Sequence, residues 1–142
     1  MVYQVNAIEF KIGVGGRESA EVDMVLVRDM EEFEISFDNG IEEWTPFGTD
    51  GWARRFMTAK SMTISVSGKR NPDDVGNNYV ASLAFANGEA TKSVLAVVFP
   101  DGAQLCMPCV VNVTAAGGGS AGDIGSLSFE CQSDGKPEYV RG

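Results

Sequence analysis

The sequence predicts a mainly β protein, an antiparallel β-sandwich or barrel with one flanking α-helix at about residues 72–86 and a long extended loop. Residues 32–37 and 61–67 alternate polar and apolar side chains, as strands with one buried face require. Residues 93–113 have the pattern of a strand, a Pro-Asp-Gly-Ala turn and a second strand. With 142 residues, the chain is expected to form one domain over residues 1–142.

The strand signals follow one another along most of the chain, and the sheet is expected to be mostly antiparallel. In chain order, the expected strands are residues 8–14, 23–30, 32–37, 61–67, 93–99, 104–113 and 127–131. A glycine-rich stretch at residues 115–126 is expected to be a flexible connection.

The expected helix has start signals and one apolar stripe. Asn71 can cap its start, and Pro72 suits the first helical position. Apolar side chains four residues apart predict a buried stripe formed by Val75, Tyr79 and Leu83. Residues 76–78, Gly-Asn-Asn, are poor helix formers, so the first turn needs support from the rest of the protein.

The long extended loop lies between the two clearest strands and begins at residue 39. Its sequence fits neither the helical nor the strand period, and long irregular connections are usually functional or disordered. Trp44, Phe47 and Trp52 argue against disorder because disordered segments contain few aromatic residues.

Charge is spread unevenly along the chain. The net charge is −9, and the first 50 residues contain twelve acidic side chains but only three basic ones. A window without acids follows at residues 54–70, with Arg54, Arg55, Lys60, Lys69 and Arg70. Two oppositely charged surfaces on one chain favour head-to-tail association of copies, although solvated surface charge explains the same pattern.

The sequence argues against an enzyme. It contains no histidine, which removes the commonest general base and most zinc sites. Cys106 and Cys109 lie in an expected strand, where residues three apart point to opposite faces, so they and Cys131 are expected to be small buried or half-buried thiols. We therefore expect no cofactor and no metal site, and the negative net charge argues against dedicated nucleic-acid binding.

The sequence also gives no sign of a membrane or secretory protein. No apolar run approaches the roughly 20 residues that a membrane-spanning helix needs. The first ten residues lack the basic and apolar regions of a secretory signal. Assembly is therefore expected in the cytoplasm, without a membrane partner.

Several segments follow one another in a distinctive order between Phe33 and Pro137: FDNGIEEWTPF, GWARRFMTAKSMTISVSGKRNPDDVGNNYVASL, FPDGA, VVNV and GGGSAGDIGSLSFECQSDGKP. In this order of segments the chain resembles the tail tube (major tail) proteins of long-tailed bacteriophages. The strongest part is Gly51-Trp52 with the arginine pair that follows, and the first 26 residues contribute least.

This resemblance implies a tail-tube-like fold and a structural role in a virion tail assembled in the host cytoplasm. Hexameric rings would stack head to tail into a hollow tube through which DNA passes without specific binding. The implied partners are other copies of the chain and further tail proteins, such as the tape measure, tail terminator and distal tail proteins.

Under this resemblance, the long loop is the best candidate for contacts between stacked rings. Aromatic and arginine side chains are favoured at the centre of interfaces. The expected subunit-interface residues are Trp44, Phe47, Trp52, Arg54, Arg55 and Lys60. The alternative is that these aromatic residues fold back onto the core of their own subunit.

The polar strand faces are candidates for the surface that lines the tube. The expected lumen-facing residues are Glu32, Glu34, Ser36, Ser61, Thr63, Ser65 and Ser67. Such a surface would let DNA slide, since it repels phosphate and offers few cations to bind it.

Two other functions fit the same sequence. One is the tube subunit of a related contractile or secretion apparatus. The other is a monomeric β-sandwich that binds carbohydrate or protein through its tryptophans.

Overall fold

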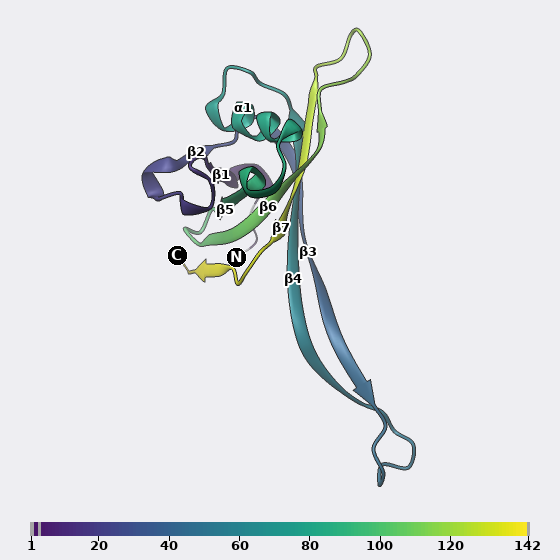
Figure 1. The fold of residues 1–142 in the computed structure, drawn as a ribbon. Coiled ribbons are helices and arrows are strands. Elements are labelled where there is room, and N and C mark those ends of the chain that lie inside the picture. The colour runs from purple at the N-terminus through teal and green to yellow at the C-terminus, as the bar shows by residue number, and fades with distance from the viewer. Residues whose placement is uncertain (1, 3, 142) are drawn as a thin grey trace.

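The computed structural model describes Val2 and residues 4–141, and antiparallel strands dominate it (Figure 1). The strands are β1 (Glu9–Gly13), β2 (Met24–Leu26), β3 (Met30–Trp44), β4 (Arg54–Lys69), β5 (Lys92–Val98), β6 (Gln104–Ala116), β7 (Ser126–Ser133) and β8 (Glu138–Val140). The helix α1 (Val75–Ser82) continues as a 3-10 turn (Leu83–Phe85), and further 3-10 turns are Val5–Ala7, Gly16–Glu18, Glu21–Asp23 and Gly88–Thr91. The predicted mainly β class with one flanking helix is confirmed.

All strand pairs belong to one sheet with the order β2-β1-β5-β6-β7-β4-β3, and β8 pairs with β6. Four strands separate β1 from β3 in this order, yet the rings of Phe10 and Phe33 meet edge to face with centroids 5.1 Å apart. The sheet must therefore curl until its two ends face each other. The curl gives one sheet the enclosed core of a sandwich or barrel.

The core lies on the inner face of the curled sheet. Alternate residues of each long strand point inward, so Met62, Ile64 and Val66 of β4 are buried while their neighbours are not. Leu95, Met107 and Phe129 of the adjoining strands fill the same core, and α1 covers it with Val80 and Ala81. The alternation read from the sequence is thus confirmed for β4. In β3, Phe33 and Ile35 are partly buried, but Phe37, predicted on the buried face, is 65% exposed because it lies where the hairpin leaves the core.

The helix begins later than predicted and buries a different face. Its first residue is Val75, not residue 72, because the Asp74 side chain caps it by accepting a hydrogen bond from the Asn77 amide at 3.0 Å. Val75 is 65% exposed, so its predicted inward position is wrong. Tyr79 is partly buried and Leu83 is buried as predicted, but Leu83 lies in the 3-10 turn after the helix. The inward positions of the first turn belong to Gly76 and Asn77.

Asn77 supplies the support that the first turn was expected to need. Its side chain is fully buried, and its amide group donates to the backbone oxygens of Arg28 and Lys69 at 3.1 and 2.9 Å. Its oxygen accepts from the Arg70 guanidinium and the Asn71 amide, both at 2.9 Å. One side chain therefore joins the helix to the segment before β3 and the segment after β4.

Gly76 allows this close contact. A Cβ atom at this position would lie 2.1 Å from the backbone oxygen of Leu26, so only glycine lets the helix approach the end of β2. The poor helix formers at the start of α1 are thus required by packing against β2 and hydrogen bonding.

The predicted long loop is mostly strand. The β3–β4 ladder continues to the pair Trp44–Arg54, which leaves only residues 45–53 as a loop. A register shift between Gly40 and Ile41 breaks the alternation, and the outer part of the hairpin has no buried face. Without a buried face there is no two-residue hydrophobic period, which explains why the pattern was not recognised as strand.

We predict that Asn77→Ala lowers the free energy of unfolding by about 2 kcal/mol or more, because it leaves buried backbone groups without partners. The control is Asn78→Ala, which removes an exposed hydrogen bond to Arg70 and should cost about 0.5 kcal/mol or less. Chemical denaturation followed by circular dichroism measures both. Equal losses in the two variants would contradict the role assigned to Asn77.

Candidate assembly interface

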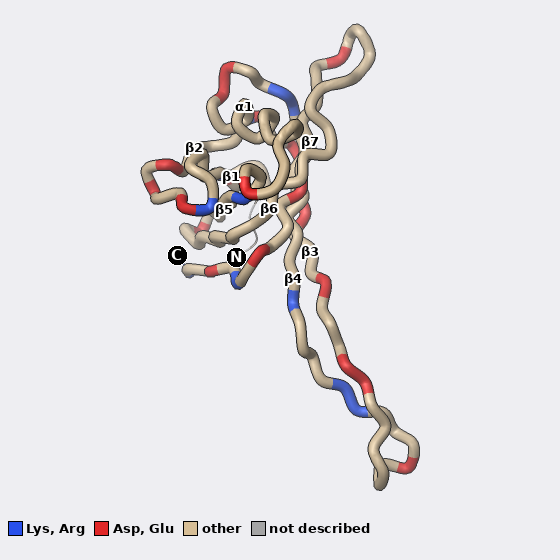
Figure 2. The backbone as a smooth tube through the Cα atoms, viewed as in Figure 1, with Lys and Arg blue, Asp and Glu red and all other residues tan. Residues whose placement is uncertain are grey.

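The outer half of the β3–β4 hairpin projects from the body of the protein as an arm (Figures 1 and 2). The pair Phe37–Met62 is the last with a buried member, since Met62 is 5% exposed and Phe37 is 65% exposed. Beyond this pair, every residue of the two strands is exposed. We call residues 38–61 the hairpin arm.

The tip of the hairpin arm has a defined turn. The Trp52 amide donates to the Thr49 oxygen at 3.0 Å, and Asp50 and Gly51 between them have positive φ angles of 52° and 85°. Positive φ at both central positions is typical of a type I′ turn, which favours Asp-Gly. This turn lies within the loop of residues 45–53 and reverses the chain at the tip of the arm.

The predicted interface residues all lie on this arm. The aromatic side chains Trp44, Phe47 and Trp52 are 45%, 107% and 78% exposed. The three basic side chains, Arg54, Arg55 and Lys60, are also exposed. Arg55 forms an ion pair with Glu43 at 2.9 Å, and Lys60 lies 3.5 Å from the Asn39 side-chain oxygen. None of the three aromatic residues folds back into the buried core.

The arm also carries apolar residues that the sequence analysis did not select. Phe56 and Met57 of β4 are 66% and 44% exposed, and Ile41 of β3 is 55% exposed. The register pairs Ile41 with Met57, and Phe56 with Glu42 on the opposite face. Both faces of the arm are therefore partly apolar, and exposed apolar surface of this kind marks interaction sites.

The predicted polar residues share one face of the sheet, which we call the outer polar face. Strand pairing places Ser65 beside Glu34 on β3 and beside Glu130 on β7. The same register brings together all seven predicted residues: Glu32, Glu34, Ser36, Ser61, Thr63, Ser65 and Ser67. It extends the face to residues not selected from the sequence, namely Asp38, Asn112, Thr114, Ser128, Glu130 and Gln132.

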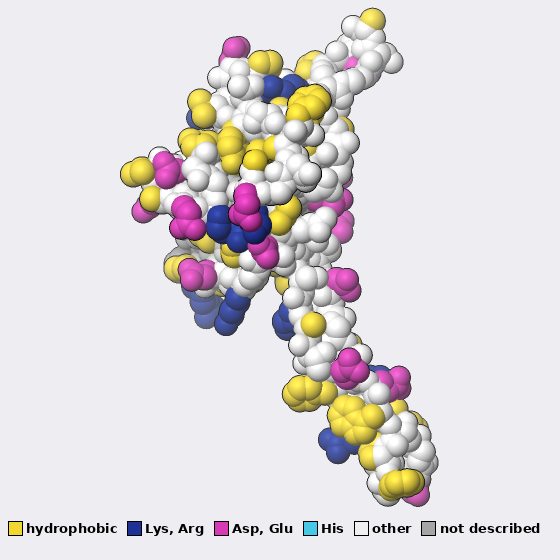
Figure 3. All heavy atoms as spheres, in the orientation of Figure 1, with side chains coloured by type: hydrophobic (Ala, Val, Ile, Leu, Met, Phe, Trp, Pro, Cys, Tyr) yellow, Lys and Arg dark blue, Asp and Glu magenta, His cyan; other side chains and the backbone are white. Residues whose placement is uncertain are grey.

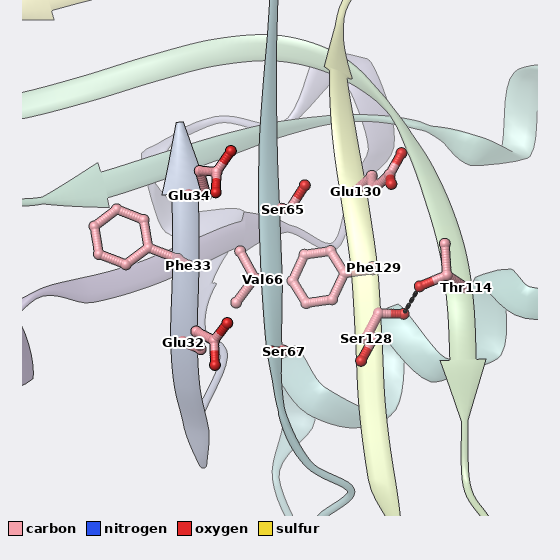
Figure 4. Close-up of a pocket in the computed structure, with 10 residues that line it drawn as sticks. All are labelled: Glu32, Phe33, Glu34, Ser65, Val66, Ser67, Thr114, Ser128, Phe129 and Glu130. Carbon is pink, nitrogen blue, oxygen red and sulfur yellow. Dashed lines mark hydrogen bonds between the residues drawn. The ribbon is translucent and has the colours of Figure 1, made fainter. Parts of the chain in front are cut away.

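Figure 4 shows the centre of this face, a shallow hollow of about 220 Å³ between β3, β4, β7 and β6. Glu32 and Glu34 border it on one side and Glu130 on the other. The Thr114 hydroxyl donates to the backbone carbonyl oxygen of Ser128 at 3.1 Å across the β6–β7 pair. The hollow is a negatively charged hydroxyl surface without a buried polar group aimed into it.

Basic residues are excluded from the centre of the outer polar face. Between Ser61 and Ser67, none of the outward-facing β4 residues is basic. Lys69 lies at the end of the strand and forms an ion pair with Glu31 at 3.3 Å. Within the described residues, Glu32, Glu34 and Glu130 form no ion pair. Their negative charges are therefore not neutralised by an ion pair and act on any molecule that approaches this face of the sheet.

Among the described residues, no three His, Cys, Asp or Glu side chains cluster as a metal site requires. Cys106 is half-buried while Cys109 is buried, in agreement with the predicted opposite faces. The Cys109 side chain contacts that of Cys131 on β7, although their backbone partners are Ser133 and Val111, and the sequence did not reveal this contact. Hydrogen bonding to Cys109 and burial raise the pKa of Cys131 well above its usual value, which keeps this thiol protonated and unreactive.

No helix in the described part of the chain is long and apolar enough to span a bilayer.

The curled antiparallel sheet, the flanking helix and the projecting hairpin form a fold that is shared with chains of known structure. Two solved structures of gene transfer agents contain chains with this fold. One is the tail of an empty particle, refined with helical and C6 symmetry, with a TM-score of 0.76, 16% identity, and coverage of 98% of this chain and 99% of that one. The other is the virion of the native particle, with a TM-score of 0.72, 16% identity, and coverage of 98% and 99%.

A third similar chain belongs to the sheath/tube terminator of the extracellular contractile injection system PVC, with a TM-score of 0.62, 11% identity, and coverage of 99% of this chain and 97% of that one. No protein-family model and no curated protein matches this chain. At such low identities the shared property is the fold, and at this level the resemblance found in the sequence is confirmed.

The position of both tryptophans on the hairpin arm predicts a simple spectroscopic result. The chain has only two tryptophans, so its indole fluorescence reports the arm alone. At low concentration, where sedimentation gives the mass of one chain, emission should be that of water-exposed indole and accessible to iodide. Blue-shifted, iodide-resistant emission from the single chain would instead place the tryptophans against their own body.

Proposed function

We propose that this protein is a structural subunit, with residues 1–142 as a single tail-tube domain, that forms hexameric rings stacked head to tail into the hollow tail tube of a virion or virion-like particle. DNA is delivered through the tube. The observation that carries the proposal is the hairpin arm. It is a long two-stranded ladder that exposes apolar side chains on both faces and does not pack against the body of its own subunit. No enzymatic activity and no cofactor belong to this function.

The arm supports the proposal because an isolated two-stranded hairpin is only marginally stable in water. Its exposed aromatic and aliphatic side chains gain hydrophobic stabilisation only when another molecule covers them. A second copy of the chain, in the adjacent ring, provides that cover in a tube. Trp44, Phe47 and Trp52 then act as anchors, while Arg54, Arg55 and Lys60 contact acidic groups of the adjacent copy.

The outer polar face supports the assignment of a lumen. DNA carries a dense line of negative charge, and proteins that hold it do so with basic side chains. The carboxylates of Glu32, Glu34 and Glu130 form no ion pair within the described residues, and Lys69 at the end of β4 pairs with Glu31, so phosphates are repelled and DNA slides past. Ring closure by six copies directs this face inward.

A tube of stacked rings has two ends, and each end needs a partner protein that differs from the repeating subunit. The similar structures include a sheath-tube complex and a tube-terminating cap of contractile systems. By analogy, this protein binds copies of itself along the tube, and a tail terminator, a tape measure and a distal tail protein at its ends or within it. The assembled protein is located in the virion tail, with assembly in the host cytoplasm.

The second candidate is the tube subunit of a contractile injection apparatus. The likeness to contractile-system chains favours it, with TM-scores of 0.62 and 0.59 over nearly the whole chain. We rank this second candidate below a virion tail tube because the TM-score to the gene transfer agent tail is higher, at 0.76.

We predict that Trp52→Ala leaves the chain folded but prevents tube formation, because a buried aromatic anchor contributes about 2 kcal/mol or more at an interface. Electron microscopy and sedimentation over a range of concentrations report rings and tubes, and circular dichroism reports folding. The control is Phe85→Ala, which removes a 96% exposed aromatic side chain from the body and should leave the tubes intact.

Unmodified protein that stays a single chain at every concentration, and binds a glycan saturably, would overturn the tube and favour a binding module. Normal tubes from Trp52→Ala would remove the hairpin tip from the interface.

The lumen assignment predicts a gain of DNA retention. Glu32→Lys with Glu34→Lys should give tubes that hold short duplex DNA in a nuclease-resistant form, released by salt. Glu18→Lys with Glu21→Lys makes the same change in net charge at exposed residues outside the outer polar face, so DNA bound to those tubes should be digested. Nuclease-sensitive DNA on both sets of tubes would place the outer polar face on the outside.

A further inference from the structure

A groove lies where the hairpin arm leaves the body. It has a volume of about 400 Å³, and we call it the hairpin-base groove. Phe37 and Met62 form one wall, and Pro137, from the segment between β7 and β8, forms the other. Lys60 and Lys136 lie one on each side. Figure 3 shows basic side chains on both sides of this hollow, between the underside of the body and the arm.

The chemistry of the groove defines its occupant. Phe37 is 65% exposed, so the groove leaves apolar surface in water that an apolar side chain can cover. Neither Lys60 nor Lys136 forms an ion pair with a described residue. A fitting occupant therefore has an apolar side chain and a carboxylate next to each other.

The opposite end of the molecule carries such a pair. The β6–β7 loop, residues 117–125, projects away from the body at the end opposite the hairpin arm (Figure 1). It contains Asp123 followed by Ile124, whose side chain is 67% exposed, and it contains no basic residue.

The loop holds this pair in a defined turn although it is rich in glycine. The backbone amide of Asp123 donates to the backbone carbonyl oxygen of Ser120 at 2.9 Å. The Asp123 carboxylate accepts from the backbone amide of Ser120 at 2.8 Å. At the base of the loop, the Gly117 amide donates to the Ser126 oxygen. Fixing the turn before binding lowers the entropy that docking must overcome.

We infer that the β6–β7 loop of one copy docks in the hairpin-base groove of the copy in the adjacent ring, with Ile124 against Phe37 and Asp123 between Lys60 and Lys136. The inference rests on the proposed stacking. If the arm of one copy extends into the next ring, the base of that arm lies at the junction between the two rings. The β6–β7 loop of the copy in the next ring faces the same junction. The contact is heterologous, so it repeats at every ring.

A cross-linking experiment tests this contact. The double variant Ser61→Cys with Ile124→Cys places one thiol at the rim of the groove and one on the loop, with Cys106→Ser in every variant because Cys106 is the native thiol that is not fully buried. After assembly and mild oxidation, each chain should be joined to the next along the tube. A non-reducing gel should then show a ladder of multiples of one chain, which a reductant collapses. Either single variant should give dimers at most.

The matched control is Ser61→Cys with Val22→Cys, because Val22 is 90% exposed in the Glu21–Asp23 turn, outside the loop end of the molecule. It should give no ladder. Independently, Ile124→Asp should raise the protein concentration needed for tubes about tenfold or more, whereas Val22→Asp should leave it unchanged.

Normal tubes without a ladder, and without an effect of Ile124→Asp, would overturn the docking contact and leave the proposed function standing. A protein that forms neither rings nor tubes would overturn both.

Discussion

The rest of the structure depends on one ladder, the antiparallel pairing of β3 with β4. These are the longest strands, with 15 and 16 residues, and only their inner halves are part of the body. There Ile35 pairs with Ile64 and Phe33 with Val66, and β4 also pairs with β7, so the inner half is fixed by burial on one face and hydrogen bonds on both sides. Beyond the body, the backbone pairing continues without a buried face and extends the same two strands as the arm.

Residues of this ladder belong to three environments, namely the core, the outer polar face and the hairpin arm. The face of the strand and the position along it decide which environment a residue occupies. The inward residues of β4, such as Ile64, belong to the core, and their immediate neighbours, such as Ser65, belong to the outer polar face. Farther along the strand, Phe56 and Arg54 belong to the arm. A one-residue change in register would exchange core and polar face over the whole inner half, so burial fixes the register strongly.

Sequence patterns predicted the parts of the fold in which burial and periodicity coincide. The inner strands and the polar face of β3 and β4 were predicted because one face of each strand is buried, and the Pro-Asp-Gly-Ala turn was predicted from its proline and glycine. The outer hairpin was predicted as a loop because burial is absent there. The inward position predicted for Val75 was wrong because Asn77, a polar residue, occupies the inward position through four hydrogen bonds. Glu130 and the Cys109–Cys131 contact depend on pairing between distant strands, which no local pattern encodes.

The continuity of β4 from core to arm has a mechanical consequence for a stacked tube. The arm runs along the strands of the body, so tension along the tube pulls β4 parallel to its own axis. Antiparallel hydrogen bonds lie perpendicular to the strands, so this load shears the bonds to β3 and β7. The bonds share the force and must break together, whereas a load across the strands would open them one at a time. In the proposed tube, β4 would therefore also transmit axial tension from the arm into the core of its own subunit.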